Sequence, residues 1–301
     1  MRKLALIALI IITSFCFYAC KSNSLGAINS FQVKDTLSAV NSIPVKIILL
    51  YGQSNATGLA GNDYLKEKAP DTYAKAEEGY QNVLINLFTE NGGNSSNGEF
   101  VPVTLGQGAS KDYFGPELGL ADALSERFAQ EKVFAIKYSW GGSILNSQWL
   151  NGKYERGELY NAAISFTKTS LEYLKSKGYI PEIAAVCWMQ GESDAIEKRV
   201  AKRYLKNTRN FVGFLGEDLK DYCSNPLFID AGVAEIEVWK HYEIVNGAKK
   251  QVAEESDLNV YFSTAEMGLT TDKEPEGNAD IAHFDSLSAF ALGRKFASYI
   301  D

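Results

Sequence analysis

The feature of this sequence that most constrains its fold is a regular alternation of short apolar blocks with longer amphipathic segments. The apolar blocks span residues 45–51, 83–88, 133–138, 183–189, 227–233 and 259–264. Helical periodicity runs through residues 117–130, 159–177, 195–219, 242–255 and 286–299. Near-continuous apolar strands separated by helices are typical of a parallel sheet covered on both faces. The pattern therefore predicts a three-layer α/β/α fold with a central parallel sheet.

The segments that directly follow the apolar blocks are the first place to look for chemistry, because open parallel sheets bind ligands beyond the carboxyl ends of their strands. The first block is followed by Gly52-Gln53-Ser54-Asn55. The third is followed by Ser139-Trp140-Gly141-Gly142-Ser143, and the fourth by Gln190-Gly191-Glu192-Ser193-Asp194. Polar groups at the end of an apolar strand are costly to bury unless they are hydrogen-bonded, so we expect these groups to have a purpose.

Ser54 is a candidate nucleophile, since a serine after a buried strand and a turn-permitting glycine is presented at the mouth of the sheet. Capping of a following helix is the alternative role. Ser143, directly after Gly142, and Ser193, two residues after Gly191, are weaker candidates. The adjacent glycines Gly141 and Gly142 either turn their N–H groups toward an anion or form an ordinary tight turn.

The candidate general base comes from a choice between two histidines, His241 and His283. Asp280 lies three residues before His283, close enough in a turn for its carboxylate to reach Nδ1 and leave Nε2 free as a base. His241 begins a helical segment, and the acids upstream of it are Glu235 and Glu237. His283 is therefore the predicted base.

Charge and composition exclude several classes of protein. The 301 residues carry 30 Lys and Arg against 37 Asp and Glu, a net charge of −7, and beyond the N-terminus no basic cluster stands out. Nucleic-acid binding needs a basic face, so we expect no nucleic-acid partner. An aromatic content of 12% argues against a collagen, a coiled coil or a disordered chain. Oligomeric state is left open.

The N-terminus has the pattern of an export signal. Arg2 and Lys3 precede an apolar run over residues 4–12, which is too short to span a bilayer. Cys20 follows a small residue, as at a bacterial lipoprotein processing site. We therefore expect residues 1–20 to form a signal peptide ending at a lipidated Cys20, residues 21–44 a tether, and residues 45–301 one domain. The predicted location is periplasmic or outer-membrane associated, with the lipid anchor as the only membrane contact; an ordinary cleaved signal peptide is the alternative.

The remaining cysteines predict neither a metal site nor a cofactor. Cys187 lies in an apolar block, where a thiol is most often a small buried hydrophobe. A disulfide with Cys223 is the alternative in an exported protein. The two cysteines and two histidines lie too far apart for zinc-ligand spacing.

Three motifs together resemble those of the SGNH/GDSL hydrolase superfamily. Gly52-Gln53-Ser54-Asn55, the block from Trp188 to Asp194, and Asp280-x-x-His283 occur in the family's order. Phe114-Gly115-Pro116-Glu117 and Gly141-Gly142-Ser143 lie between them. Within the superfamily the chain is similar to the sialate O-acetylesterases and the family 6 acetylxylan esterases over residues 45–301. One departure is Ile281-Ala282, where the family often has a glycine.

The resemblance implies a flavodoxin-like fold and a set of site residues. Ser54 would be the nucleophile, His283 the general base and Asp280 its orienting acid, with Asp285 and Asp194 as alternative acids. The oxyanion would be bound by the backbone N–H of Ser54, a glycine N–H and the Gln190 side chain. Gly115 is the implied glycine, and Gly141 or Gly142 is the rival. The predicted substrate-binding residues are Gln53, Asn55, Gly142, Trp149 and Glu192.

The resemblance also implies removal of acetyl groups from a glycan. Trp140, Trp149 and Trp239 are candidates for stacking on a sugar ring, with core packing as the alternative. Two other functional classes stay open: a different hydrolase of the superfamily, such as a lipase or thioesterase, and a glycan-binding lipoprotein without activity. Metal-dependent deacetylation is a weaker rival.

Overall fold

A seven-stranded sheet forms the centre of the fold in the computed structural model, which describes residues 42–89 and 94–301. The strand order is β4-β3-β6-β1-β7-β8-β9. All neighbours pair in parallel except β4, which runs antiparallel to β3 at one edge. The strands are β1 Ile43–Gly52, β3 Tyr80–Thr89, β4 Val101–Val103, β6 Val133–Ser139, β7 Tyr179–Met189, β8 Leu227–Ala231 and β9 Asn259–Phe262.

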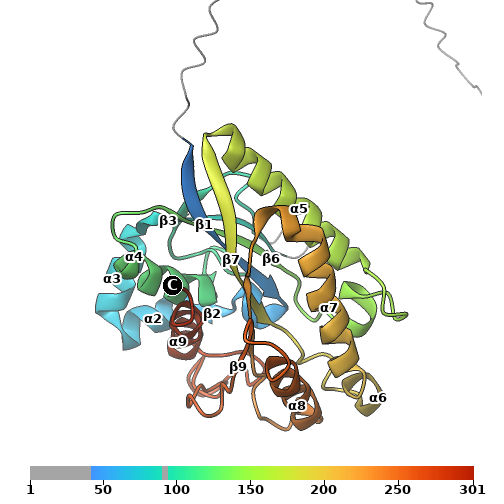
Figure 1. The fold of residues 1–301 in the computed structure, drawn as a ribbon. Helices are drawn as coiled ribbons and strands as arrows, with labels where there is room; N and C mark the ends of the chain where they lie inside the picture. Colours follow the sequence, from blue (N-terminus) through green and yellow to red (C-terminus); the bar gives the residue numbers. More distant parts are fainter. Residues whose placement is uncertain (1–41, 90–93) are drawn as a thin grey trace, which may run out of the picture. The chain divides into compact units, whose positions relative to one another are not determined.

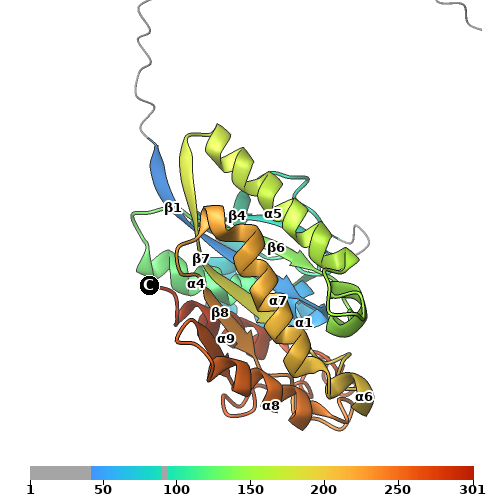
Figure 2. The same cartoon turned by 45° about the vertical axis from the view of Figure 1, so that its right-hand side comes forward.

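Helices cover both faces of the sheet, as Figures 1 and 2 show. One layer holds α2 Asn62–Lys68, α3 Pro70–Glu78, α4 Pro116–Arg127 and α9 Ser286–Ala297, and the other holds α5 Glu158–Ser176, α7 Tyr204–Leu219 and α8 Tyr242–Ala253. The predicted α/β/α fold with a central, mostly parallel sheet is therefore confirmed. The short helices α1 Ser54–Thr57 and α6 Lys198–Ala201 lie between these elements in the chain.

The apolar blocks of the sequence form the strands as predicted, and those at the centre of the sheet are buried between the helical layers. Every residue of β6 is buried, and residues 47–50 in the middle of β1 are fully buried. Several short elements were not predicted: α1, α2, α3, the edge strand β4, and the two-residue strands β2 Ala60–Gly61 and β5 Tyr113–Phe114. These pieces have too few residues to show a period in the sequence.

The prediction of a helix over residues 195–219 is wrong in its first part. Residues 191–197 form turns after β7, and the long helix begins only at Tyr204. The polar side chains of this turn bond to neighbouring segments: Asp194 accepts hydrogen bonds from the backbone N–H groups of Leu145 and Asn146. The predicted signal peptide, Cys20 and residues 21–41 of the predicted tether lie outside the described residues, and residues 43 and 44 already belong to β1.

The register of the central strands brings their carboxyl ends level with one another. Gly52 at the end of β1 pairs with Ser139 of β6 on one side and with Met189 of β7 on the other. The segments that follow these three strands must therefore meet at one edge of the sheet. Gly52 has a φ of +151°, and a Cβ atom there would lie 1.9 Å from the Met189 carbonyl oxygen, so only glycine fits this turn.

A buried ion pair also holds segments at this edge of the sheet in place. Lys137, in the middle of β6, is fully buried, and its ammonium donates to Glu117 Oε2 at 2.7 Å and to the backbone carbonyls of Thr57 and Gln107 at 2.8 and 2.9 Å. All three N–H bonds of the ammonium thus have acceptors. Thr57 is the last residue of α1, so this pair ties α1 to the sheet and to α4.

Candidate active site

Ser54 lies at the N-terminus of α1, directly beyond the end of β1. Its side chain is half-buried, and within residues 42–89 and 94–301 its hydroxyl forms no hydrogen bond. Its backbone N–H is likewise without an acceptor in that part of the chain, as expected for the first residue of a helix. The structure therefore presents both the hydroxyl and an N–H group of Ser54 at the carboxyl edge of the sheet.

His283 and Asp280 form the predicted acid–imidazole pair in the loop before α9. Asp280 Oδ2 lies 2.7 Å from His283 Nδ1, and Asp280 Oδ1 accepts a hydrogen bond from the Ala282 N–H at 3.1 Å. The imidazole is about one-fifth exposed. A carboxylate bound to Nδ1 selects the tautomer in which Nε2 is a free base.

The alternative acids and the alternative histidine are engaged elsewhere. Asp285 caps α9 by accepting a hydrogen bond from the Ser288 N–H, and Asp194 bonds to the backbone of Leu145 and Asn146. His241 lies at the N-cap of α8, where its backbone N–H donates to Ala195. Of the three acids considered, Asp280 is the one that contacts His283.

Asn55 connects the Ser54 helix to the histidine loop. Its Oδ1 accepts a hydrogen bond from the Phe284 N–H at 3.0 Å, and its Nδ2 donates to Glu192 Oε1 at 2.7 Å. Since Asn55 follows Ser54 and Phe284 follows His283, these bonds draw the candidate nucleophile and the candidate base together. Three segments distant in sequence therefore meet at one amide.

The sequence predicted that Glu192 binds substrate, but in the structure Glu192 positions other protein groups. Its side chain is fully buried, and its Oε2 has no hydrogen-bond partner among the described residues. Burial raises the pKa of its carboxyl, while the hydrogen bond from Asn55 lowers it. A group with no access to solvent cannot contact a glycan, so we correct that prediction.

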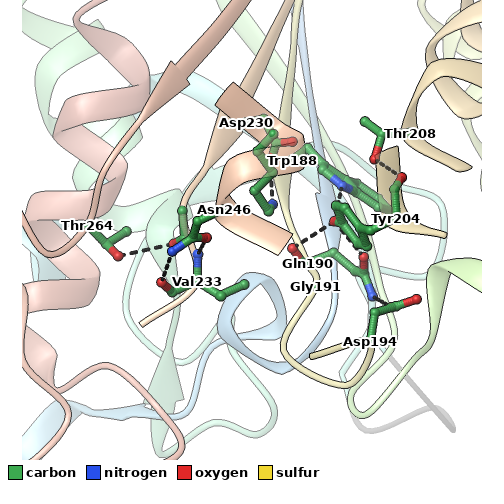
Figure 3. A network of polar contacts seen from close by, with 12 residues as sticks. Trp188, Gln190, Gly191, Asp194, Tyr204, Thr208, Asp230, Val233, Asn246 and Thr264 are labelled. Atoms are coloured by element: carbon green, nitrogen blue, oxygen red, sulfur yellow. Dashed lines mark hydrogen bonds and ion pairs between the residues drawn. The ribbon is translucent and has the colours of Figure 1, made fainter. Parts of the chain in front are cut away.

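Gln190 also holds other protein groups. Its amide nitrogen lies 2.7 Å from Asp194 Oδ2, 3.0 Å from the Ser143 carbonyl and 3.3 Å from Gln53 Oε1, and its Oε1 accepts from the Tyr204 hydroxyl. Figure 3 shows Gln190, Asp194 and Tyr204 grouped in this network. Both amide hydrogens are used inside the protein, so the expected oxyanion role of Gln190 does not fit the geometry.

Gly115 fails as an oxyanion donor for a similar reason. Its N–H donates to Glu117 Oε1 at 2.7 Å in a buried position, and that carboxylate is the partner of Lys137. The rival glycines fit better: within the described residues the N–H groups of Gly141 and Gly142 have no acceptor. Trp140, just before them, donates its N–H to the Gly52 carbonyl at 3.0 Å, which places this turn beside Ser54.

Two further predicted substrate contacts are corrected, because Gln53 and Trp149 are buried. Gln53 Oε1 accepts from the N–H groups of Gly191 and Ser193 and so fastens the turn after β7 to the end of β1. Trp149 is fully buried, donates to Ser143 at 2.9 Å and packs edge-on against Trp188. Gly142 is exposed, and Asn55 is almost entirely buried.

Solvent exposure also separates the tryptophans proposed to stack on a sugar and the serines proposed as alternative nucleophiles. Trp239 is buried, as Trp149 is. Of the three candidate tryptophans, only the half-buried Trp140, beside Gly141, can therefore reach a sugar. Ser143 is fully buried, and Ser193 accepts from Gln53. Cys187 is buried as predicted, and it and Cys223 are both free thiols, so the alternative disulfide is absent.

One buried carboxyl behind the site, that of Asp230, was missed by sequence reasoning. Asp230 forms an ion pair with Lys249 inside the protein, and burial raises the pKa of Asp230 to about 6. Burial likewise raises the pKa of Asp194 to about 6. The sequence does indicate the buried Lys137, because this lysine interrupts an apolar block. It gives no such indication for Lys249, which lies in a helix where lysines are common.

Neither a metal site nor a membrane span is found in the part of the chain that the structure describes. No group of three or more His, Cys, Asp or Glu side chains in residues 42–89 and 94–301 is placed to hold a metal ion. No helix among the same residues is both long and apolar enough to cross a membrane.

Comparisons with solved structures support the fold class. The structure is similar to a protein from Arabidopsis thaliana with a TM-score of 0.60 and 20% identity, covering 85% of this chain and 97% of that one. It is similar to NanS with a TM-score of 0.57 and 17% identity, covering 86% and 97%. A carbohydrate acetylesterase from Xanthomonas citri gives a TM-score of 0.53 and 14% identity, covering 83% of this chain and 54% of that one. No curated protein matches the sequence.

The mostly parallel sheet flanked by helices and the likeness to these solved structures define an SGNH-like α/β/α fold. Residues 44–301 match the family described as "Carbohydrate esterase, sialic acid-specific acetylesterase". The chain belongs to that family. The resemblance to the carbohydrate esterases inferred from the sequence is confirmed at the level of this family.

Replacing Asp194 by asparagine tests the cost of burying this carboxyl. With a pKa raised to about 6, the folded chain holds a proton between about pH 4 and pH 6 that the unfolded chain has released. As the pH is raised from about 4 to about 6, the free energy of unfolding of the unsubstituted chain should therefore fall by about 3 kcal/mol relative to that of Asp194→Asn. Urea titrations across the window measure this difference. A difference that grows in favour of the unsubstituted chain as pH rises would contradict the raised pKa.

Proposed function

We propose that the protein is a serine esterase that removes O-acetyl groups from carbohydrates through an acyl-enzyme on Ser54. The family is one of carbohydrate esterases. The observation that carries the mechanism is the pairing of Asp280 with His283 Nδ1 at 2.7 Å in a loop that Asn55 bonds to the Ser54 helix. This set supplies a nucleophile, a base and an orienting acid.

With these groups the reaction has two steps, acetylation of Ser54 and hydrolysis of the acetyl-enzyme. His283 Nε2 takes the proton of the Ser54 hydroxyl as Oγ attacks the acetyl carbonyl carbon, and then gives that proton to the sugar oxygen as the C–O bond breaks. Acetyl-Ser54 and the free sugar hydroxyl result. Water then attacks the acyl carbon with Nε2 accepting its proton, and acetate leaves as the proton returns to Ser54.

The negative oxygen of each tetrahedral intermediate needs donors that are free before the reaction. In this proposal they are the backbone N–H of Ser54 and that of Gly141 or Gly142, which have no acceptors among the described residues. Donors held in place by a rigid turn stabilise the developing charge without reorganising, and each contributes on the order of 10²–10³ in rate.

Export and lipid attachment at Cys20 complete the proposal and rest on the sequence alone. A membrane-anchored esterase would act on glycans outside the cytoplasm.

Acetate release from a panel of O-acetylated glycans tests the nucleophile. We expect Ser54→Ala to lower kcat by at least about 10³-fold, because the covalent route is lost. His283→Ala should do the same, while His241→Ala should keep most of the activity. Full activity in Ser54→Ala would refute the assignment, and binding without hydrolysis in the unsubstituted protein would favour a glycan-binding lipoprotein. Esters of longer acyl groups distinguish an acetylesterase from a lipase or thioesterase.

Asn55→Ala tests the proposed connection between Ser54 and His283. Removing the amide breaks the bonds to Phe284 and Glu192, and a misplacement of about 1 Å costs on the order of 10²-fold in rate. We therefore expect kcat to fall by about 10- to 100-fold with a smaller change in KM.

Asn246→Ala is the matched control for this variant. Asn246 is also a buried asparagine that bonds to backbone, at Val233, but it lies in α8. It should lose stability and keep kcat. Equal losses of kcat in the two variants would mean that Asn55 contributes only to stability.

A further inference from the structure

A basic helical surface lies beyond the turn that follows β7, at the carboxyl edge of the sheet. Six of the twelve residues from 198 to 209 are lysine or arginine and none is acidic, in a chain whose net charge is −7. This run corrects the sequence-based expectation that no basic cluster stands out beyond the N-terminus. It forms α6 and the first turns of α7, beside α8 (Figures 1 and 2). We propose that this surface binds a bilayer that carries anionic phospholipid headgroups.

The cations of this run lie on one side of the helices. Lys202 and Arg203, between α6 and α7, have helical backbone angles, so the helical spacing continues across the junction. Cations recur every four residues and therefore share one side, while Ala201, Tyr204 and Thr208 on the other side are buried. The basic face consists of five exposed side chains: Lys198, Arg199, Lys202, Arg203 and Lys206.

The protein does not neutralise the charges of the basic face. Within residues 42–89 and 94–301 none of its side chains belongs to an ion pair or forms a hydrogen bond. Lys206 Nζ lies 3.9 Å from the centroid of the Tyr154 ring, an arrangement that leaves its charge in place. Arg209, the sixth cation of the run, is paired with Glu255 and is not part of the face. Like charges four residues apart destabilise a helix, so the basic face points to a partner of opposite charge.

The shape of the basic face fits a flat surface. The face is the outer side of a helical run, and none of its residues lines the hollows of about 250 to 590 Å³ in the described part of the chain. From Lys198 to Lys206 the run extends about 12 Å, at about 1.5 Å per residue. A convex strip of this kind can lie against an array of headgroups, but it cannot enclose a sugar chain.

Exposed apolar side chains lie next to these cations. Ile196, two residues before Lys198, is 49% exposed. The His241 N–H donates to the Ala195 carbonyl at 2.9 Å, and this bond holds the loop that carries Val238, 36% exposed, against the start of the basic run. Membrane-surface sites combine cations, which attract headgroups, with apolar side chains that enter the boundary of the acyl region. A soluble polyanion would use the cations alone, so the combination favours a bilayer.

A bilayer bound at the basic face would lie beside the candidate active site. Asp194, in the turn before α6, accepts a hydrogen bond from the Asn146 N–H, and Asn207 of α7 donates to Asn146 Oδ1 at 3.4 Å. The start of α7 therefore adjoins the segment that follows the Gly141–Gly142 turn. A lipid anchor at Cys20, as proposed above, would raise the concentration of the domain at the membrane, and the basic face would turn this edge of the sheet toward it. Binding of this kind is independent of esterase activity.

Co-sedimentation with vesicles tests the proposal. The full chain is mixed with vesicles of phosphatidylcholine, with or without phosphatidylglycerol, at low salt and at about 1 M salt. Each cation at an anionic bilayer contributes about fivefold to binding, so Lys198→Gln with Lys202→Gln should bind the anionic vesicles about 25-fold more weakly at low salt. On phosphatidylcholine alone, and at high salt, this variant and the unsubstituted chain should bind alike. The apolar N-terminal run is present in every arm and contributes equally to each.

Lys177→Gln with Lys220→Gln is the matched control. These lysines are also exposed and belong to no ion pair among the described residues, but they lie at the far ends of α5 and α7. The control removes the same charge and should bind anionic vesicles as tightly as the unsubstituted chain. Lys198→Arg with Lys202→Arg should do the same, because it keeps the charge. Ile196→Ser also keeps the charge, yet it should bind more weakly because an apolar contact is lost.

Three results would overturn the proposal. One is an equal loss of binding in the Lys198/Lys202 glutamine variant and in the Lys177/Lys220 control, which would mean that net charge alone matters. Another is unchanged binding in the Lys198/Lys202 glutamine variant. The third is binding of polygalacturonate, a soluble polyanionic glycan, as tightly as anionic vesicles and without any effect of Ile196→Ser, which would assign the face to a glycan chain. Circular dichroism of each variant checks that the fold is kept.

Discussion

The two hydrogen bonds of the Asn55 amide are the interaction on which the rest of the site depends. One ends at Glu192, in the turn after β7, and the other at Phe284, beside the histidine. Parallel strands bring the ends of β1, β6 and β7 level, whereas the loop before α9 is attached through hydrogen bonds such as those of Asn55 and Ser286. The Asn55 amide reaches this loop together with the buried Glu192 carboxyl, whose Oε1 accepts its hydrogen bond and whose Oε2 has no partner among the described residues. Asn55 thereby links the helix of the candidate nucleophile to the loop of the candidate base.

Most of the other polar groups at this edge hold protein segments in place. Gln53 and Gln190 join the turn after β7 to β1 and to the turn after β6, and Lys137 with Glu117 joins α1 to α4. Among the described residues, the backbone N–H groups of Ser54, Gly141 and Gly142 have no acceptor at this edge. Buried hydrogen-bonded groups such as these make the surrounding segments rigid, and rigidity is what a preorganised site requires.

Most of the fold could be predicted from the sequence, because the apolar blocks are long enough to show which segments are buried between helices. The Asp280–His283 contact was also within reach, since it is local. The oxyanion assignments for Gly115 and Gln190 were not, because a sequence shows which groups are present but not which are already paired. Trp149 and Glu192 illustrate the same limit: both are chemically suited to binding a sugar, and both are fully buried. Short elements such as α1 and β4 gave no periodic signal.

The most direct test of the central proposal is to look for the acyl-enzyme itself. The protein is mixed with an acetylated substrate carrying an isotopic label in the acetyl group, quenched in acid during turnover, digested and examined by mass spectrometry. We predict labelled acetyl on the peptide that contains Ser54, and none on that peptide from Ser54→Ala. Label on Ser143 or Ser193, or turnover with no labelled peptide at all, would contradict the mechanism.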